Sequence, residues 1–506
     1  MFDLERIVLF FKKNFDRKDL LFIFGLIALY ALTRLINLEQ LPIFNDEGIY
    51  IHWAKIAWHD AAWRFVSLTD GKQPLQTWGT IPFLKLFPHD ALFAGRLFSV
   101  ATGLFGLTGM FVLLYYLFNK KTAYIGSLLY VFIPYFLFYD RMAMVDSGVN
   151  AFFIWILLFS VLLAKTLRLD VALIFGLLAG MGLLAKSSVR VFVGMSLFAP
   201  LLFHDVFHRS KQGLKKLLSF FFLFAVTGIL ATAMYNIQRL SPFLHFVEEK
   251  NKTFVMTFGE WLRQPFAVFW NNVTTIPYYV FSELGWVVVP FGALGLFLLF
   301  KHHKRLAIYF VLWIIIPYLG IACMTRVLFP RYIIFFGTLI VILASYCLNQ
   351  IKDKKIAAFA LLAIIISALF FDYFMWFDYR GIIFPDTDRG QYIEGVTVGY
   401  GAKGIIEYAR EKTKERPVVI LADGNFGMSG DILDTFLKPT DTISIVGYWP
   451  LGEKELRAHQ WELRNKYVFV VLAHQLTYPA EWPVKLIMSY YKPKRDSVIH
   501  LLELTK

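Results

Sequence analysis

Cysteine and charged residues are both scarce in this chain of 506 residues. The only two cysteines, Cys323 and Cys347, lie in apolar stretches, which excludes a disulfide framework. Charged residues make up 17% of the sequence, against about 25% in an average soluble protein. Hydrophobic residues make up 58%. Because no soluble surface could cover so much apolar side chain, the composition excludes a disordered chain and disfavours an ordinary set of soluble domains.

Long apolar stretches follow one another through residues 1–376. A membrane-spanning helix needs about 20 mostly apolar residues. Eleven stretches come close to this length, so the sequence predicts a polytopic α-helical membrane protein with about 11 transmembrane helices. They are residues 20–38, 93–118, 122–138, 149–164, 171–185, 191–203, 217–235, 284–300, 306–323, 333–349 and 356–376. The first is not a cleavable signal peptide, because it is long and lacks a small-residue cleavage site.

The basic residues indicate how the chain is oriented. Alternate loops carry 19 basic residues and seven acidic ones, so the positive-inside rule places these loops in the cytoplasm. They are residues 1–19, 119–121, 165–170, 204–216, 301–305 and 350–355. The net charge of +14 is therefore mainly a signal of membrane topology, and we expect no nucleic-acid partner. The intervening loops, of which residues 39–92 form the first, would face outward.

Residues 377–506 differ from the apolar part, with 17 basic and 17 acidic residues and only short apolar runs. Helix-like and strand-like segments alternate here, which predicts a small extracytoplasmic α/β domain after a transmembrane domain of residues 1–376. The expected helices are 402–415, 429–437 and 453–466, and the expected strands are 417–422, 442–447 and 467–473. Gly424, Gly427 and Gly430 do not have the G-x-G-x-x-G spacing, so a structural turn is expected there rather than a nucleotide loop.

The first outer loop opens with an acidic pair, Asp46 and Glu47. Ile49, Trp53 and Ala57 then share one helical face, which predicts a helix lying in the membrane interface. Asp46 and Glu47 could be functional, or could be an acidic pair that caps this helix.

A second acidic position, Asp146, follows Arg141 after the third apolar stretch and starts the next helix. It too could be a cap, yet an acid at a membrane boundary is costly and often functional. Carboxylates suit proton abstraction from a hydroxyl, and nearby cations suit a phosphate leaving group.

The order and sidedness of the motifs resemble the GT-C membrane glycosyltransferases over roughly residues 20–345. The nearest branch is the protein O-mannosyltransferase and lipid A aminoarabinose transferase group with its RgtA/B/C/D-like bacterial relatives. The matching motifs are Asp46-Glu47, Lys72-Gln73-Pro74-Leu75, Arg141 to Asp146, Gly182-Leu183-Leu184-Ala185-Lys186 and Pro330-Arg331-Tyr332. Gln73 departs from the first proline of the family's Lys-Pro-Pro-Leu-like motif.

The resemblance implies an inverting transferase that moves a sugar from a polyprenyl-phosphate donor to a hydroxyl or phosphate of a lipid, glycan or protein acceptor. It would act on the outer face of a bacterial or archaeal plasma membrane, among membrane lipids. Asp46 would be the general base, with Glu47 and Asp146 orienting the acceptor or the sugar. The implied phosphate ligands are Lys72, Lys186 and Arg331, with Arg141 and Arg190 behind them; the implied sugar or acceptor contacts are Trp53, Trp78 and Tyr332.

Other interpretations of these residues stay open. Lys186 and Arg190 could extend to lipid headgroups, and the tryptophans could be interfacial anchors. His52 and His59 near Asp46 and Asp60 do not have diagnostic metal spacing, so no metal site and no cofactor is firmly expected, although a divalent metal is possible. A polytopic transporter or lipid flippase is the main alternative function, and a scaffold or receptor is a third.

Overall fold

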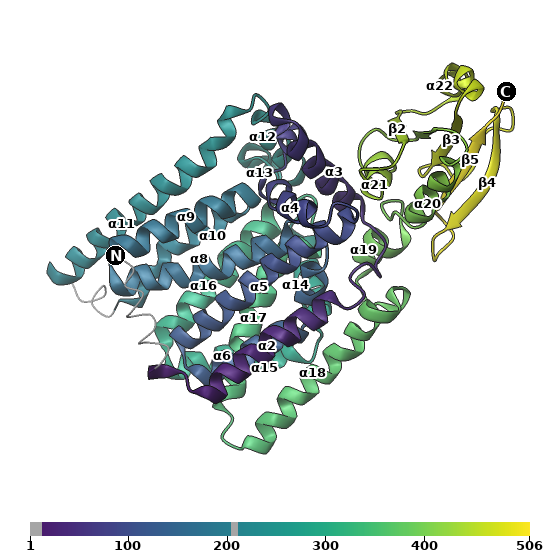
Figure 1. Cartoon of the computed structure of the whole chain (residues 1–506). Coiled ribbons are helices and arrows are strands. Elements are labelled where there is room, and N and C mark those ends of the chain that lie inside the picture. The colour runs from purple at the N-terminus through teal and green to yellow at the C-terminus, as the bar shows by residue number, and fades with distance from the viewer. Residues whose placement is uncertain (1–12, 204–210) are drawn as a thin grey trace.

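The helical part of the protein is a bundle of long apolar helices, and a small sheet stands at one end of it (Figure 1). The structure is a computed structural model that describes residues 13–203 and 211–506. The predicted cytoplasmic segments 1–19 and 204–216 therefore lie partly outside the described residues. The bundle helices are α2 (Arg17–Leu35), α5 (Ala91–Leu117), α6 (Lys120–Phe132), α7 (Pro134–Asp140), α8 (Asp146–Thr166), α9 (Leu169–Ala185), α10 (Val189–Met195), α11 (Lys211–Tyr235), α14 (Phe269–Leu284), α15 (Val288–His302), α16 (Lys304–Met324), α17 (Ile334–Gln350) and α18 (Lys354–Phe377).

All eleven predicted stretches overlap these helices, although breaks shorten several of them, and most of residues 191–203 lies in the 3₁₀ helix Ser196–Leu202 that follows α10. Of the described helices, six are long and apolar enough to cross a membrane, or up to eight if each bent pair is one span. The pair α6 and α7 bends by 61° at Ile133, where Pro134 cannot continue the backbone ladder. The pair α14 and α15 bends by 110° beyond Gly285, whose φ is +77°. The chain is an integral membrane protein of mostly helical fold.

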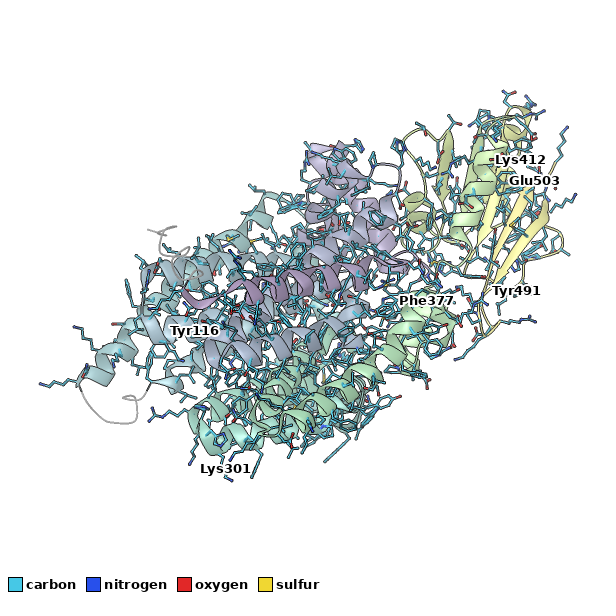
Figure 2. All side chains as sticks on the ribbon, turned by 60° about the horizontal axis from the view of Figure 1, so that its bottom comes forward. Tyr116, Lys301, Phe377, Lys412, Tyr491 and Glu503 are labelled. Carbon is cyan, nitrogen blue, oxygen red and sulfur yellow. The ribbon has the colours of Figure 1, made fainter. Side chains whose placement is uncertain are left out.

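Burial divides the bundle into inner and outer helices. In the most apolar segment of α8, and of the span that contains α17, 83% of the residues are buried. In the corresponding segments of α11 and α18, only 22% and 28% of the residues are buried. The outer helices present bare apolar side chains such as Phe222 and Phe359, which are 69% and 74% exposed. In Figure 2, Phe377 at the end of α18 lies toward the sheet, whereas Tyr116 and Lys301 lie toward the other end of the bundle. An apolar exterior of this kind suits lipid contact.

The C-terminal sheet has five strands in the order β2-β1-β3-β5-β4. Strands β1 (Val418–Ala422), β2 (Ile443–Gly447) and β3 (Tyr467–Leu472) are parallel, and they match the three predicted strands. Strands β4 (Val484–Tyr491) and β5 (Val498–Leu504) complete the sheet as antiparallel partners, and both lie beyond the last predicted element. The helices of this part are α20 (Ala402–Lys412), α21 (Gly430–Thr435) and α22 (Glu453–Ala458). The small α/β fold is thus confirmed.

The first long loop folds into α3 (Asn45–His59), two short 3₁₀ helices (Ala61–Trp63 and Val66–Asp70) and α4 (Leu75–Leu86). Figure 1 shows α3 on the side of the bundle that faces α21 and the sheet. Ile49, Trp53 and Ala57 are buried against protein, so this face is not presented to a membrane surface as the sequence suggested. The reason is close packing on the C-terminal part: a Cβ on Gly48 would lie 3.1 Å from the Cα of Ile432.

Candidate active site

The carboxylate of Asp46 lies in the first turn of α3 and meets two cations from distant parts of the chain. Its Oδ1 is 3.1 Å from Nζ of Lys72, which precedes α4, and its Oδ2 is 3.5 Å from Nη2 of Arg331, in the 3₁₀ turn before α17. The Asp46 side chain keeps 25% of its surface exposed, so this ion-pair group can be reached from outside. The first turn of a helix also favours a carboxylate, because the helix dipole is positive there.

A second ion pair lies beside the first and is joined to it by one aromatic ring. Asp146, the first residue of α8, accepts a 2.8 Å hydrogen bond from Nζ of Lys186, which follows the end of α9. The ring of Tyr332 has Lys186 Nζ 4.1 Å from its centre and the Arg331 guanidinium 5.2 Å away. We call Asp46, Lys72, Asp146, Lys186 and Arg331 the ion cluster.

The ion cluster carries one more positive than negative charge. Lys72 and Arg331 pair with Asp46, and Lys186 pairs with Asp146, while Nζ of Lys72 also lies 3.7 Å from the Asp70 carboxylate. Including the neighbouring Asp70 leaves this excess, because Asp70 is itself 2.6 Å from Nζ of another cation, Lys250. Such a surplus at a partly open site suits an anion.

Burial raises the pKa of the Asp46 carboxyl, but the charges of Lys72 and Arg331 and the hydrogen bond from Lys72 lower it more strongly, so the pKa lies below that of an ordinary aspartate. Asp46 is therefore ionised at neutral pH and can accept a proton. The same cations that keep it charged also reduce its basicity, so their engagement by another anion would change its proton affinity.

Arg331 is held by residues that the sequence analysis did not single out. Its Nη1 donates a 2.8 Å hydrogen bond to the hydroxyl of Tyr392 and a further bond to the side-chain oxygen of Gln391. Both residues lie in the short helix Gly390–Glu394, far along the chain, where the sequence gives no motif. Gln73, which replaces the family's proline, donates to the hydroxyl of Ser187 next to Lys186.

Glu47 points away from the ion cluster although it follows Asp46 directly. Its two carboxylate oxygens each lie 2.9 Å from a guanidinium nitrogen of Arg96, and they also accept from the backbone N–H groups of Phe44 and Ala143. Both Glu47 and Arg96 are fully buried. The capping interpretation of the acidic pair thus describes Glu47, through its bond to Phe44, but not Asp46.

Arg141 and Arg190 do not contact either carboxylate of the ion cluster in the described structure. Arg141 is fully buried and donates to the backbone carbonyls of Thr33, Arg34, Ile36 and Asn37, where it caps the end of α2. The Arg190 guanidinium lies 4.8 Å from the ring centre of Tyr235. A long basic side chain near a helix end can turn either way, and the sequence does not show which.

Of the three aromatic residues proposed to contact the sugar or the acceptor, two lie beside the ion cluster and one does not. Tyr332 belongs beside the ion cluster, and the buried ring of Trp53 lies 5.6 Å from Nζ of Lys72. Trp78 instead donates its indole N–H to the carbonyl of Arg64 and packs on Phe65 within the first long loop.

His52 approaches acids of the C-terminal part rather than Asp46. Its Nδ1 is 2.9 Å from the Asp434 carboxylate of α21. Within the described residues, 13–203 and 211–506, no group of three or more His, Cys, Asp or Glu side chains is placed to hold a metal ion.

Comparisons with known proteins show what this architecture resembles. Residues 72–233 match the family model described as dolichyl-phosphate-mannose-protein mannosyltransferase. No curated protein sequence matches the chain. The crystal structure of ArnT from Cupriavidus metallidurans in the apo state superposes with a TM-score of 0.59 and 14% identity, covering 95% of this chain and 97% of that one.

Two ligand-bound structures are also similar. ArnT bound to undecaprenyl phosphate gives a TM-score of 0.60 at 12% identity, with 95% of this chain and 97% of that chain covered. The archaeal oligosaccharyltransferase AglB from Archaeoglobus fulgidus, in complex with an inhibitory peptide and a dolichol-phosphate, gives 0.53 at 12% identity, with 91% and 70% covered. The long first loop, the helical bundle and the C-terminal α/β part of this chain together have the GT-C fold of these membrane glycosyltransferases.

Proposed function

We propose that the protein is an inverting glycosyltransferase that moves a sugar from a polyprenyl-phosphate donor to an acceptor hydroxyl at the outer face of the membrane. The observation that carries this proposal is the ion cluster, in which the partly exposed carboxylate of Asp46 and the buried carboxylate of Asp146 share a site with three cations. Support comes from the similar structures of ArnT and AglB, which were determined with bound undecaprenyl phosphate and a dolichol-phosphate, respectively. The site would belong to a transmembrane domain of residues 1–376, with residues 377–506 outside a bacterial or archaeal plasma membrane.

The lipid phosphate would be bound by Lys72, Lys186 and Arg331. Arg331 can hold two phosphate oxygens at once through its planar guanidinium, whereas the lysines act as point charges. The phosphate would replace Asp46 and Asp146 as the partner of some of these cations. As the bond between the anomeric carbon and the phosphate oxygen breaks, its electron pair remains on the phosphate, where these cations stabilise the growing charge.

Asp46 would act as the general base. The acceptor oxygen attacks the anomeric carbon from the face opposite the phosphate, and the hydroxyl proton passes to the Asp46 carboxylate. The new glycosidic bond then has inverted configuration, and the lipid phosphate leaves. Once a donor phosphate engages Lys72 and Arg331, fewer cations remain to hold down the pKa of Asp46, so donor binding itself would make the base stronger.

The remaining candidates take supporting roles in this mechanism. Asp146 would hold Lys186 and orient the sugar, with the ring of Tyr332 beside both cations. Glu47 is a positioning residue, because it fixes the start of α3 through Arg96 and through two backbone N–H groups. Arg141 would have only a structural role, because it binds backbone carbonyls at the end of α2.

A transfer assay tests this function directly. Purified protein in nanodiscs receives polyprenyl-phosphate donors carrying different radiolabelled sugars, together with lipid, glycan and peptide acceptors. Asp46→Asn is expected to lower turnover by about 10²- to 10⁴-fold, the usual contribution of general base catalysis. Asp60→Asn is the matched control, because Asp60 lies just beyond the other end of α3 and caps the following turn. Unchanged turnover in Asp46→Asn would contradict the base assignment, and lipid transport without sugar transfer would favour a flippase.

A further inference from the structure

The three parallel strands of the C-terminal sheet end in loops, and the loop after β1 contacts α3, the helix that carries Asp46. In α/β folds, ligands bind beyond the carboxyl ends of parallel strands. Here the loops after β1 and β2 are residues 423–429 and 448–452, and residues 473–483 follow β3. Figure 1 places α21, which directly follows the first of these loops, next to α3.

The loop after β1 reaches the helix that carries Asp46. Gly427, with φ of +73°, lies so close to Asn45 that an added Cβ would be 2.4 Å from the side-chain oxygen of Asn45. The neighbouring ring of Phe426 lies 5.9 Å from that of Trp53. Since Trp53 is also next to Lys72, a continuous series of contacts runs from the ion cluster to Phe426.

Two aromatic side chains at the carboxyl ends of these strands, Phe426 and Trp449, are exposed to solvent. Phe426 is 46% exposed, and Trp449, in the loop after β2, is 67% exposed. The loop after β1 contacts the end of β2, two residues before Trp449, because a Cβ on Gly447 would lie 2.4 Å from the Cα of Asn425. The ring of His474, from the segment after β3, lies 5.1 Å from that of Trp449. Two exposed apolar rings therefore share one edge with polar side chains.

We propose that Phe426 and Trp449 form a platform that binds a sugar ring of a glycan-containing acceptor, next to the base Asp46. This rests on the function proposed above. A pyranose offers flat C–H faces for aromatic rings and hydroxyls for polar neighbours such as Asn425 and His474. An acyl chain would need a continuous apolar surface, and polar residues such as Asn425 and His474 lie beside the two aromatic rings here. The platform would be the acceptor side of the site, with the lipid phosphate on the side of Arg331 and Lys186.

The platform is tested with the full-length protein and a glycan array. The probes are immobilised oligosaccharides, including chitotriose, maltotriose and mannotriose, with saccharide-free peptides and anionic lipid vesicles alongside. The double variant Phe426→Ala/Trp449→Ala is expected to bind at least one saccharide about tenfold more weakly than the wild type. Trp461→Ala is the matched control, because Trp461 is also 67% exposed but lies in the turn Gln460–Arg464 after α22. It should bind as the wild type does.

The inference is overturned if no saccharide distinguishes wild type from the double variant, or if only vesicles or peptides bind. A second readout separates this failure from failure of the proposed function. Release of the sugar from a polyprenyl-phosphate donor to water needs no glycan, so the double variant should retain its rate, while the KM for a glycan acceptor rises about tenfold. If Asp46→Asn abolishes this release while the double variant has a normal acceptor KM, the function stands and the platform does not.

Discussion

Asp46 and Glu47 are adjacent in the chain and have the same charge, yet they belong to two groups of ion pairs with opposite properties. Asp46 belongs to the ion cluster, where its side chain is 25% exposed and its oxygens share Lys72 and Arg331. Glu47 belongs to a buried group, with Arg96 fully enclosed beside it. We call Glu47, Arg96 and Arg141, with the 3.1 Å pair of Arg34 and Asp140, the buried framework.

The difference lies in how completely each charge is satisfied. Glu47 receives hydrogen bonds on both oxygens from a guanidinium and from backbone N–H groups, and Arg141 saturates the last carbonyls of α2. Such charges stabilise a fold only while their partners stay in place. The ion cluster instead keeps an excess of positive charge and an opening. Charges of the second kind can exchange partners for a ligand, whereas charges of the first kind cannot.

The largest expected effect comes from breaking the buried framework. Glu47→Ala leaves the Arg96 guanidinium buried without its carboxylate, which should cost about 3–5 kcal/mol of unfolding free energy. Thermal unfolding in detergent measures this, with Asp46→Ala as the matched variant at the neighbouring position. Asp46→Ala should unfold near the wild-type temperature. Equal destabilisation by the two substitutions would remove the distinction between the groups.

Arg141→Lys tests whether a framework arginine has any role at the site. The lysine keeps the charge but cannot reach all four carbonyls, so we expect a loss of about 1–3 kcal/mol in stability. The donor KM should stay at the wild-type value. A raised donor KM with unchanged unfolding temperature would show instead that Arg141 binds the phosphate.

The pH dependence of catalysis reports the cations around Asp46. Because the pKa of Asp46 is lowered, its active carboxylate form persists as pH falls, and kcat/KM should decline only at a pH below the ordinary pKa of an aspartate. Lys72→Ala removes one of the charges that lower this pKa, so the acid limb of kcat/KM should move up by about one pH unit, equivalent to about 1.4 kcal/mol. Lys55→Ala is the control, since Lys55 lies on α3 but pairs with Asp434. An acid limb that does not move in Lys72→Ala would exclude Asp46 as the titrating base.

The smallest effect is expected at the contact between α3 and α21, where ion pairs are partly exposed. Burial lowers the pKa of His52, but its hydrogen bond to Asp434 and the charges of Asp434 and Asp431 raise it more strongly, against an opposing charge from Lys55. A raised histidine pKa means stabilisation that is complete below about pH 6.5 and is lost as pH rises through the folded pKa.

Because the His52 side chain is 30% exposed, this stabilisation should stay below about 1 kcal/mol. Unfolding temperatures at about pH 6 and about pH 9 should differ less in His52→Gln than in the wild type. An identical pH dependence in both proteins would assign the effect to other groups.

Much of the fold could be predicted from apolar run length alone, because a span must be long and uncharged. All eleven predicted stretches are helical, but the bends at Ile133 and Gly285 were not predicted, because a proline or a glycine allows a bend without fixing its angle. The burial of the apolar face of α3 was not predicted either, because its covering partner, α21, lies far along the chain.

The positions of the ion cluster could be named from the order of short motifs, and the structure brings these five residues together. Sequence could not show that Glu47 and Arg141 turn away, because adjacent residues at a helix start or a loop point in different directions. It also could not identify Tyr392, which reaches Arg331 only through the tertiary fold.

The most direct test of the distinction between the two groups is binding of undecaprenyl phosphate, measured as a shift in unfolding temperature. With lipid at about 100 times its Kd, the wild type should gain about 2.7 kcal/mol. Arg331→Gln should lose most of this gain. Arg326→Gln should keep it, because Arg326 lies five residues earlier and pairs with Glu260 instead. An undiminished shift in Arg331→Gln would contradict the assignment of the ion cluster as the lipid-phosphate site.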